Sequence, residues 1–460
     1  MRVLALAAAL GLAAARLADS QPPASKPIVW TDLAPLHTRL EAHGVTATSF
    51  GAFVEKTHTD SLRRVREGDL DHLVFYALQS THFTKLPPIE PALSAKALVD
   101  SLNPATRDAF LESRADVEPP IPPAVRERVA ALLRSLDSPA GDSRLTYFQS
   151  LVQTTFPDRR NREAGVLGEY LRAMRFIYQK EFVAQRAGAD AVAELYRTRG
   201  LSTDTAVEAG YLVSLGLGVV KALDPATRIR RVLIIGPGLD LAPRTALIEG
   251  GSPESYQPWA VIDALLSLGL SRADDLEVVG ADINPRVVQH LRRARAAPPA
   301  LTLVSEIGET DRISFTQEFR EYFNGLGRSI GDVEAGTPAP KGHLGKVIRV
   351  NPAAARALGA QQLDIVTERL DGPKFDLVIV TNVLPYFDDV QLMLAISNIA
   401  GMLAPGGVLL HNEARPSLRD VTAALGVSFE QSRHVIIATV RGAAAPLFDS
   451  VWLHRAITHH

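Results

Sequence analysis

The sequence predicts an α/β protein in which an all-helical segment precedes a doubly wound, mostly parallel sheet. Two observations carry this prediction. Residues 28–200 place apolar side chains at three- to four-residue spacing, as amphipathic helices do. Residues 201–460 instead alternate short aliphatic runs with helical patterns, which is the order of elements in a parallel sheet. We therefore expect the chain to divide into two parts near residue 200.

Composition excludes several classes of function. The chain has 460 residues and a formal net charge of -2, so neither nucleic acid nor an anionic membrane is expected as its main partner. It has no cysteine, which excludes disulfides, thiolate metal ligands and a cysteine nucleophile. The histidines are scattered and lack the H-E-x-x-H spacing of a zinc site, so no metal site is expected.

The first residues are typical of a secretory signal peptide. Arg2 precedes an uninterrupted apolar run from Val3 to Ala15, and small residues at Ala13 and Ala15 match an A-x-A cleavage site. The run is shorter than the ~20 residues that span a bilayer. Residues 1–18 are therefore interpreted as a signal peptide or an amino-terminal anchor, and an Ala/Leu-rich helix is the alternative. No further transmembrane segment is expected.

Prolines and capping residues divide the first half of the chain into separate helices. Pro87-Pro88 and the Pro-rich stretch 118–123 interrupt the helical pattern. Asn103-Pro104 and Asp224-Pro225 each place a capping side chain before a proline, so both predict a helix start. Residues 161–185 form a long amphipathic segment, and we interpret its aromatic side chains as part of the core.

The predicted sheet begins with the aliphatic run Arg231–Ile235, which is typical of a strand buried on both faces. This run ends at Gly236-Pro-Gly238, where glycines allow a sharp turn and the close approach of a ligand. Open α/β sheets bind nucleotide-like ligands at such carboxyl ends. Six further runs complete a seven-stranded sheet, at residues 276–282, 346–350, 375–381, 407–411, 434–440 and 450–454.

Two features depart from simple strand and helix alternation. The last two runs are joined by residues 441–449, which leave no room for a helix, so these runs are expected to form an antiparallel hairpin. Residues 301–344 exceed what one strand–helix–strand unit needs. We interpret them as an insertion that is able to lie over the ligand cleft.

Five features of the second half follow one another in a fixed order. A glycine turn follows the first strand, an acid ends the second, Phe375-Asp-Leu-Val378 opens the fourth, Leu403-Ala-Pro-Gly-Gly407 precedes the fifth, and a hairpin ends the sheet. Together, over about residues 205–456, these features resemble class I S-adenosylmethionine-dependent methyltransferases. The segment Asn382-Val-Leu-Pro-Tyr-Phe387 is also similar to chemotaxis receptor methyltransferases, in which a helical domain likewise precedes the sheet.

The resemblance implies a Rossmann-like fold, S-adenosyl-L-methionine as cofactor, and methyl transfer as the activity. Gly236 and Gly238 are expected to lie against the amino acid portion of the cofactor, with Asp240 near its ammonium group. Asp282 is placed to accept both ribose hydroxyls, as acids do in Rossmann-type sites, and a helix cap is the alternative role. Leu241 replaces the third glycine of G-x-G-x-x-G, which argues against a nicotinamide or flavin site.

The remaining site candidates follow later strands. Asn351, rather than an aspartate, follows the presumed third strand and is expected at the adenine edge. Asn382 follows the fourth strand, where the methyl group would face the acceptor. Tyr386, His411 and Glu413 are candidates on the acceptor side. No catalytic residue is assigned, because the sulfonium makes the methyl carbon electrophilic and a base is needed only for a protonated nucleophile.

Three functions remain open from the sequence. The first is a methyltransferase with an unidentified small-molecule or protein acceptor. The second is an exported ligand-binding protein that keeps the fold without catalysis, and the third is an aminopropyltransferase-like enzyme. The second follows from a conflict, since S-adenosylmethionine is made in the cytosol whereas residues 1–18 favour export or membrane anchoring. The sequence therefore leaves both the acceptor and the compartment open.

Overall fold

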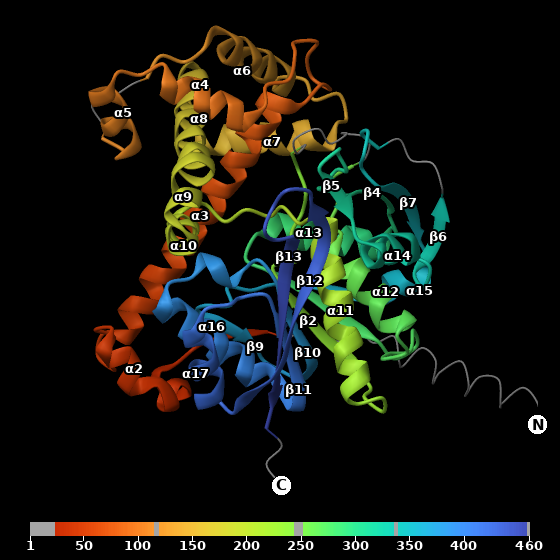
Figure 1. Cartoon of the computed structure of the whole chain (residues 1–460). Helices are drawn as coiled ribbons and strands as arrows, with labels where there is room; N and C mark the ends of the chain where they lie inside the picture. Colours follow the sequence, from red (N-terminus) through yellow and green to blue (C-terminus); the bar gives the residue numbers. More distant parts are fainter. Residues whose placement is uncertain (1–23, 115–118, 243–251, 335–338, 458–460) are drawn as a thin grey trace, which may run out of the picture.

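The computed structural model describes residues 24–114, 119–242, 252–334 and 339–457 (Figure 1). The signal peptide or anchor predicted at residues 1–18 lies outside the described residues. Within the described part of the chain, no helix is long and apolar enough to cross a membrane.

The centre of the structure is an eight-stranded sheet of order β5-β12-β13-β11-β10-β2-β3-β8. Strands β8, β3, β2, β10 and β11 run parallel, whereas β13 runs antiparallel to both of its neighbours. Their bounds are Arg231–Ile235 (β2), Glu277–Asp282 (β3), Ile313–Phe315 (β5), Leu358–Gln362 (β8), Phe375–Val380 (β10), Leu403–His411 (β11), Val427–Val440 (β12) and Leu447–Ala456 (β13). The predicted terminal hairpin is confirmed, and its second strand, β13, lies inside the sheet.

Helices cover both faces of this sheet. In β2, Val232 and Ile234 point to one face, while Leu233 and Ile235 point to the other, and all four are buried. Strands buried on both faces read as continuous aliphatic runs, which is why the sequence reveals this one. One face is covered by α11 (Val207–Leu223), α12 (Gln257–Ser267) and α13 (Pro285–Ala296), and the other by η2 (Trp30–Leu36), α16 (Asp389–Met402) and α17 (Pro416–Ala424).

The predicted count of seven strands and the predicted third strand are both wrong. The run at 346–350 forms β7 (Gly345–Val350), but β7 belongs to a separate antiparallel sheet with β4 (Ala300–Val304) and β6 (Gly331–Glu334). The third parallel position is taken by β8, whose Leu-Gly-Ala-Gln-Gln sequence is a weak strand pattern. The eighth strand is β5, which pairs with β12 at the far edge of the sheet.

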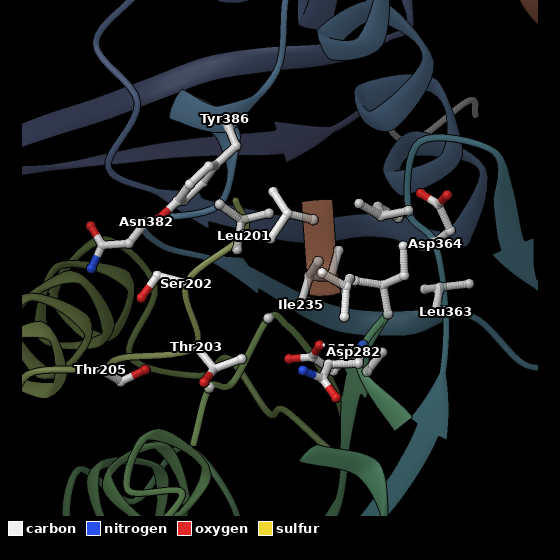
Figure 2. A pocket seen from close by; sticks show the side chains of 18 of the residues that line it. Leu201, Ser202, Thr203, Thr205, Ile235, Asp282, Leu363, Asp364, Asn382 and Tyr386 are labelled. Carbon is white, nitrogen blue, oxygen red and sulfur yellow. Dashed lines mark hydrogen bonds between the residues drawn. The ribbon is translucent and has the colours of Figure 1, made fainter. Parts of the chain in front are cut away.

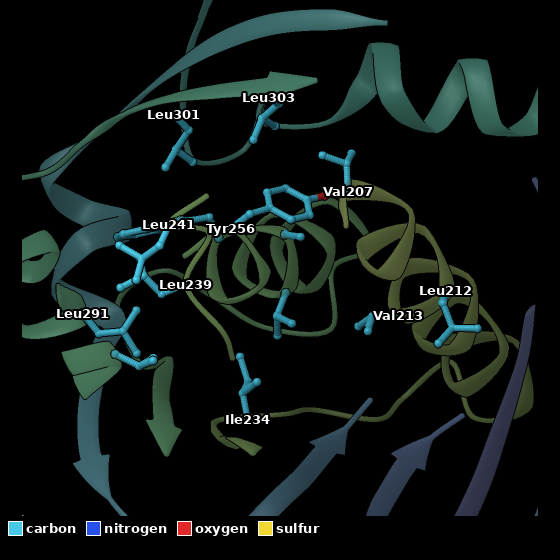
Figure 3. Close-up of a cluster of buried hydrophobic side chains, with 14 of the residues drawn as sticks. Val207, Leu212, Val213, Ile234, Leu239, Leu241, Tyr256, Leu291, Leu301 and Leu303 are labelled. Atoms are coloured by element: carbon cyan, nitrogen blue, oxygen red, sulfur yellow. The ribbon is translucent and has the colours of Figure 1, made fainter. Parts of the chain in front are cut away.

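The insertion packs on the outside of a helical layer. Leu301 and Leu303 of β4 lie over Leu241 and Tyr256 in the buried cluster that Figure 3 shows. Helix α14 (Gln317–Gly325) of the same segment contacts α11 and β12. The insertion therefore widens one face of the protein.

Residues 30–198 are mainly helical. Most buried apolar side chains between residues 70 and 177 belong to the same cluster as one face of the sheet, whereas those between residues 33 and 50 belong to the cluster on the other face. Their helices are η2, α2 (His37–Ala42), α3 (Phe50–Gln79), α4 (Pro91–Asp100), α5 (Pro104–Leu111), α6 (Pro123–Leu136), α7 (Ser143–Thr155), η3 (Arg159–Asn161), α8 (Arg162–Tyr178), the π-helix η4 (Gln179–Ala184), α9 (Gln185–Ala187) and α10 (Ala189–Thr198). Figure 1 shows α4 to α8 gathered at one end of α3, away from α2.

One of the two predicted proline helix starts is confirmed. The Asn103 side chain caps α5 by accepting a hydrogen bond from the Thr106 amide. Asp224 instead follows the end of α11, and its side chain accepts from the Ala226 amide in a turn before β2. An aspartate before proline stabilises a turn as readily as a helix start, because its side chain bonds the backbone two residues on.

The residues before α3 pack against the sheet rather than with the later helices. Strand β1 (Ser25–Pro27) pairs with β9 (Glu368–Leu370), and Arg369 donates to Asp32 of η2 at 2.7 Å. Leu33 and Leu36 of η2 are fully buried beside α16 and α17. The chain thus covers one face of the sheet before it enters α3.

Helix α3 is 30 residues long and joins these two regions. At Gly68 it approaches residue 201 so closely that a Cβ would overlap the Leu201 carbonyl group. The Leu201 amide donates to the Arg64 carbonyl at 2.8 Å in the same place. A glycine is therefore required for the docking of residues 200–202 against α3.

Gly68→Ala is expected to lower the free energy of unfolding by about 1–3 kcal/mol, because the added methyl group overpacks this contact. Gly51→Ala in the same helix is the control, since a Cβ at Gly51 meets nothing within 4 Å. Its stability should be unchanged or raised by up to about 1 kcal/mol. Denaturant unfolding of both variants measures the difference, and equal effects would contradict the close approach.

Candidate functional site

A cavity lies at the carboxyl ends of β2, β3, β8 and β10, with about 830 Å³ of empty space that includes open solvent. Parallel sheets bind ligands at this edge, beside the point where the strand order reverses. In Figure 2, Asn382 and Tyr386 lie on one side of the cavity, and Asp282 and Asp364 lie on the other. We call it the first cavity. Other lining residues include Ser61, Val65, Leu201, Ile235, Gln257, Ala281, Leu363 and Thr381.

The glycine turn after β2 is held by residues 201–205, which we call the strap. Gly236 and Gly238 both have positive φ, at 66° and 77°, and both line the cavity. A Cβ at Gly238 would overlap Thr203 and Thr205 of the strap. The Leu239 amide donates to the Thr203 carbonyl at 2.8 Å, which fixes the strap over the turn. The second glycine thus allows two backbone segments to meet.

The Asp240 side chain contacts the strap and does not line the cavity. Its carboxylate accepts a hydrogen bond from the Thr205 amide at 2.9 Å, and it is not among the lining residues. Asp204 of the strap lines the cavity instead, and its carboxylate lies 3.2 Å from Nε2 of the buried His72. Sequence reasoning missed Asp204, because its position depends on how the strap folds back over the turn.

Asp282 ends β3 inside the cavity. It is buried, and Oδ1 accepts a hydrogen bond from the Asn284 amide at 2.8 Å. Burial raises the pKa of Asp282 to about 7, although the Asn284 amide and the nearby Arg286 charge oppose this shift. The Asn284 side chain caps α13, so Asp282 itself is not the helix cap. Its carboxyl group is available to a ligand with hydrogen-bond donors.

The acid that follows the third parallel strand is Asp364. It is buried, accepts from the Val366 amide at 3.2 Å, and lies 2.9 Å from Nδ1 of His58. Burial raises the pKa of Asp364, and the contact with His58 opposes this. Asn351, the sequence candidate for this place, caps α15 (Pro352–Ala357) through the Ala354 amide and is absent from the lining. The assignment of Asn351 followed from the wrong third strand.

Gln257 adds a polar group whose partner is missing. Its Nε2 donates to Thr381 Oγ1 at 2.6 Å, while its buried Oε1 has no hydrogen-bond partner among the described residues. A buried acceptor without a partner costs about 1–3 kcal/mol, so such atoms point to an absent donor. Gln257 lines the first cavity. A ligand donor is therefore expected at this position.

Polar side chains of helix α3 contact side chains of the loops around the cavity. His58 contacts Asp364, and His72 contacts Asp204. Asp69 accepts from the Asn284 side chain at 3.0 Å and also pairs with Arg286, next to Asp282. These positions recur every three or four residues or at multiples of that spacing, so they lie on one side of α3. One helix thus fixes the loops that follow β3 and β8 and the strap that covers the turn after β2.

Asn382 and Tyr386 follow β10 at the opposite side of the cavity. Asn382 has a positive φ of 59°, and its amide and side chain both bond Asn412. Tyr386, in η5 (Leu384–Tyr386), is buried, and its carbonyl accepts from Arg64 of α3 at 3.0 Å. Both side chains line the first cavity and a second one.

His411 and Glu413 lie outside both cavities among the described residues. His411 is fully buried against His454, and burial holds the pKa of its imidazole well below its usual range. Glu413 pairs with Arg415, which in turn donates to the Leu384 and Phe387 carbonyls. Glu413 therefore supports the loop that holds Tyr386.

The second cavity adjoins the first and has about 1540 Å³ of empty space that includes open solvent. Ser202, Asp204, Asn382 and Tyr386 line both cavities. Helices α3, α4, α8 and α10 and the π-helix η4 supply most of its other walls. The insertion contributes Glu306 to this cavity and no described residue to the first. A ligand in each cavity would therefore meet at the four shared residues.

No protein-family model and no curated protein matches the sequence. Among solved structures, the chain is similar to the N-methyltransferase NodS from Bradyrhizobium japonicum WM9 in complex with S-adenosyl-L-homocysteine (15% identity, TM-score 0.26, 54% of this chain and 87% of that chain). It is also similar to the glycopeptide N-methyltransferase MtfA complexed with S-adenosyl-L-methionine (11%, 0.28, 54% and 94%). A third is the magnesium protoporphyrin IX methyltransferase ChlM from Synechocystis PCC 6803 with bound SAM (11%, 0.28, 61% and 93%).

Asp282→Asn is expected to gain stability relative to the wild type as the pH rises from about 4 to about 7. The pKa of Asp282 is about 7 in the folded protein, above the usual value of 3.8, so the folded state keeps a proton that the unfolded chain releases. The stabilisation from this neutral carboxyl is complete at low pH and is lost as the pH rises through about 7. Asparagine cannot ionise, so thermal unfolding should show a widening difference in Tm. A constant difference would contradict a neutral Asp282.

Proposed function

We propose that this chain is an S-adenosylmethionine-dependent methyltransferase that binds its cofactor in the first cavity. The observation that carries the proposal is the convergence of the glycine turn, Asp282 and Asp364 at the carboxyl ends of three neighbouring parallel strands. Phe375 and Leu403–Gly407 also lie on the neighbouring strands β10 and β11, and the hairpin of β12 and β13 pairs with β11. These positions support the proposal.

The polar groups of the first cavity fit this cofactor. Asp282 and Asp364 are buried acceptors at separate places, and Gln257 Oε1 is an acceptor without a partner. The cofactor carries matching donors in its ribose hydroxyls, its adenine amino group and its ammonium group. We assign Asp282 to the ribose, as in other nucleotide sites of this fold, and Asp364 to the adenine amino group. Leu241 is buried where a dinucleotide turn has its third glycine.

The strap and the residues after β10 are assigned to the methionine end of the cofactor. Asp204 supplies a carboxylate for the ammonium group, in place of Asp240, whose carboxylate is bonded to the strap. When bound, the cofactor supplies an electrophilic methyl group, and the protein supplies alignment. Asn382 and Tyr386 then face both the cofactor and the second cavity, so they orient the acceptor. The strap and α3 keep water from the side of the first cavity that they cover.

The finer resemblance, to chemotaxis receptor methyltransferases, is also part of the proposal. It is supported by the Asn382–Phe387 segment directly after β10 and by the helices that precede the sheet. The acceptor itself is not assigned by this resemblance. We place the acceptor in the second cavity.

Calorimetric titration with S-adenosylhomocysteine tests the proposal without turnover. At pH 8, where Asp282 is mostly ionised, the wild type should bind it, and Asp282→Ala should bind at least about tenfold more weakly, since a charge-assisted hydrogen bond contributes about 1.5–3 kcal/mol. Gln257→Leu should weaken binding by a smaller factor.

Asn351→Ala is the matched control for this titration. Losing its helix cap should cost about 0.5–2 kcal/mol of stability, because the Ala354 amide loses its acceptor, but affinity should not change. Absence of binding to the folded wild type would refute the proposal. A loss of affinity in Asn351→Ala equal to that in Asp282→Ala would place the site elsewhere.

A further inference from the structure

The second cavity contains a guanidinium with too few partners. Arg199 lines this cavity, and its side chain is only 12% exposed. Among the described residues, its one ion pair joins NH2 to Asp71 Oδ2 over 3.5 Å, and its buried Nε has no hydrogen-bond partner. A guanidinium offers five N–H donors, and a buried donor without an acceptor is costly. Arg199 therefore has one buried donor without an acceptor and one long ion pair.

The carboxylate of Asp71 is shared with another arginine. Arg172 pairs with Asp71 Oδ1 over 2.8 Å, which is a closer contact than that of Arg199. Arg64, which packs beside the same region, is buried too. Its guanidinium donates to the Arg199, Tyr386 and Tyr196 carbonyls, so these hydrogen bonds bring no carboxylate to the region. Arg172 also pairs with Glu169 over 2.6 Å, and Asp71 is thus shared by two guanidinium groups and lies farther from that of Arg199.

Aromatic rings hold the guanidinium in place. Its central carbon lies 4.2 Å from the centroid of the Phe176 ring and 5.6 Å from that of Tyr196. A guanidinium stacked in this way keeps its planar N–H edge in a fixed direction, and that edge matches carboxylate and phosphate groups. The geometry of Arg199 is therefore that of a preformed anion partner.

The acidic residues of the second cavity are engaged elsewhere. Glu181 pairs with Lys180, Glu90 accepts from the Leu93 amide as the cap of α4, and Asp204 contacts His72. Glu306 also has a contact of its own. None of the hydrogen bonds or ion pairs described for these carboxylates reaches Arg199.

We infer that the second cavity binds an organic anion with an apolar body, whose carboxylate, sulfate or phosphate group pairs with Arg199. Phe75, Ile177 and Tyr196 supply apolar wall for the body of the ligand. Tyr386, which lines both cavities, lies close enough for the Arg199 charge to act on its hydroxyl group. Identifying this anion as the methyl acceptor rests on the proposed function, whereas the anion site itself does not.

The test is calorimetric titration of the full chain with three probes, namely phenylacetate, phenyl phosphate and phenethylamine. Each titration is run with and without saturating S-adenosylhomocysteine, so that no turnover occurs. The variants are Arg199→Gln and Arg199→Lys. Arg197→Gln is the matched control, because Arg197 lies two residues away, pairs with Glu194 and lines neither cavity. Thermal unfolding verifies that each variant is folded.

The wild type and Arg197→Gln should bind at least one of the two anions and bind the amine much more weakly. Arg199→Gln should lose about tenfold or more in anion affinity, and Arg199→Lys should be intermediate, because lysine keeps the charge without the planar fork. Comparing phenylacetate with phenyl phosphate separates a carboxylate ligand from a phosphate ligand. If Arg199→Gln does not fold, the anion affinity of Arg199→Lys relative to that of the wild type tests the inference.

Three results would overturn the inference. These are equal binding of the amine, no binding of either anion to the wild type, and unchanged anion affinity in the Arg199 variants. A loss of S-adenosylhomocysteine affinity in Arg199→Gln would also overturn it, since Arg199 would then serve the carboxylate of the cofactor. Failure of the proposed function is a different result, in which S-adenosylhomocysteine does not bind while anion binding persists and still depends on Arg199.

Discussion

The candidate site depends on one set of interactions, in which polar side chains of α3, with Asp69 and His72 buried among them, bind partners in the loops of the sheet and in the strap. His58, Asp69 and His72 lie along one side of this helix and meet Asp364, Asn284 and Asp204. Burying a polar group without a partner costs more free energy than its hydrogen bond contributes in return. The contacts of α3 with the loops therefore specify one arrangement, which apolar packing alone would not. The first cavity is thus formed between α3 and the sheet, and neither part encloses it alone.

A second consequence is that two cavities meet at the strap. Residues 201–205 are held on one side by Gly68 of α3 and on the other by the glycine turn after β2. Ser202 and Asp204 face both cavities from this position. In the proposed methyltransferase the strap therefore contacts both one end of the cofactor and the anion that Arg199 is inferred to hold. The helices before the sheet take part in both tasks.

Local sequence patterns predicted the strands and turns whose formation depends on neighbouring residues in the chain. β2, β3 and β10 are buried on both faces and read as aliphatic runs, and Gly236, Gly238 and Asp282 follow directly from them. β8 is an edge strand with a weak pattern, so Asp364 was missed and Asn351 was taken in its place. The contact between His58 and Asp364 joins positions 306 residues apart. No spacing rule in a single sequence reveals such a pair, and the same holds for His72 and Arg199.

Hydrogen–deuterium exchange with and without S-adenosylhomocysteine tests most directly whether α3 and the loops of the sheet form one cofactor site. The account predicts increased protection in the strap, in the turns after β2, β3 and β8, and along α3 from His58 to His72. Helices α5 and α6, which supply no residue to the first cavity, should exchange as before. Protection limited to the loops of the sheet, with α3 unchanged, would contradict the account.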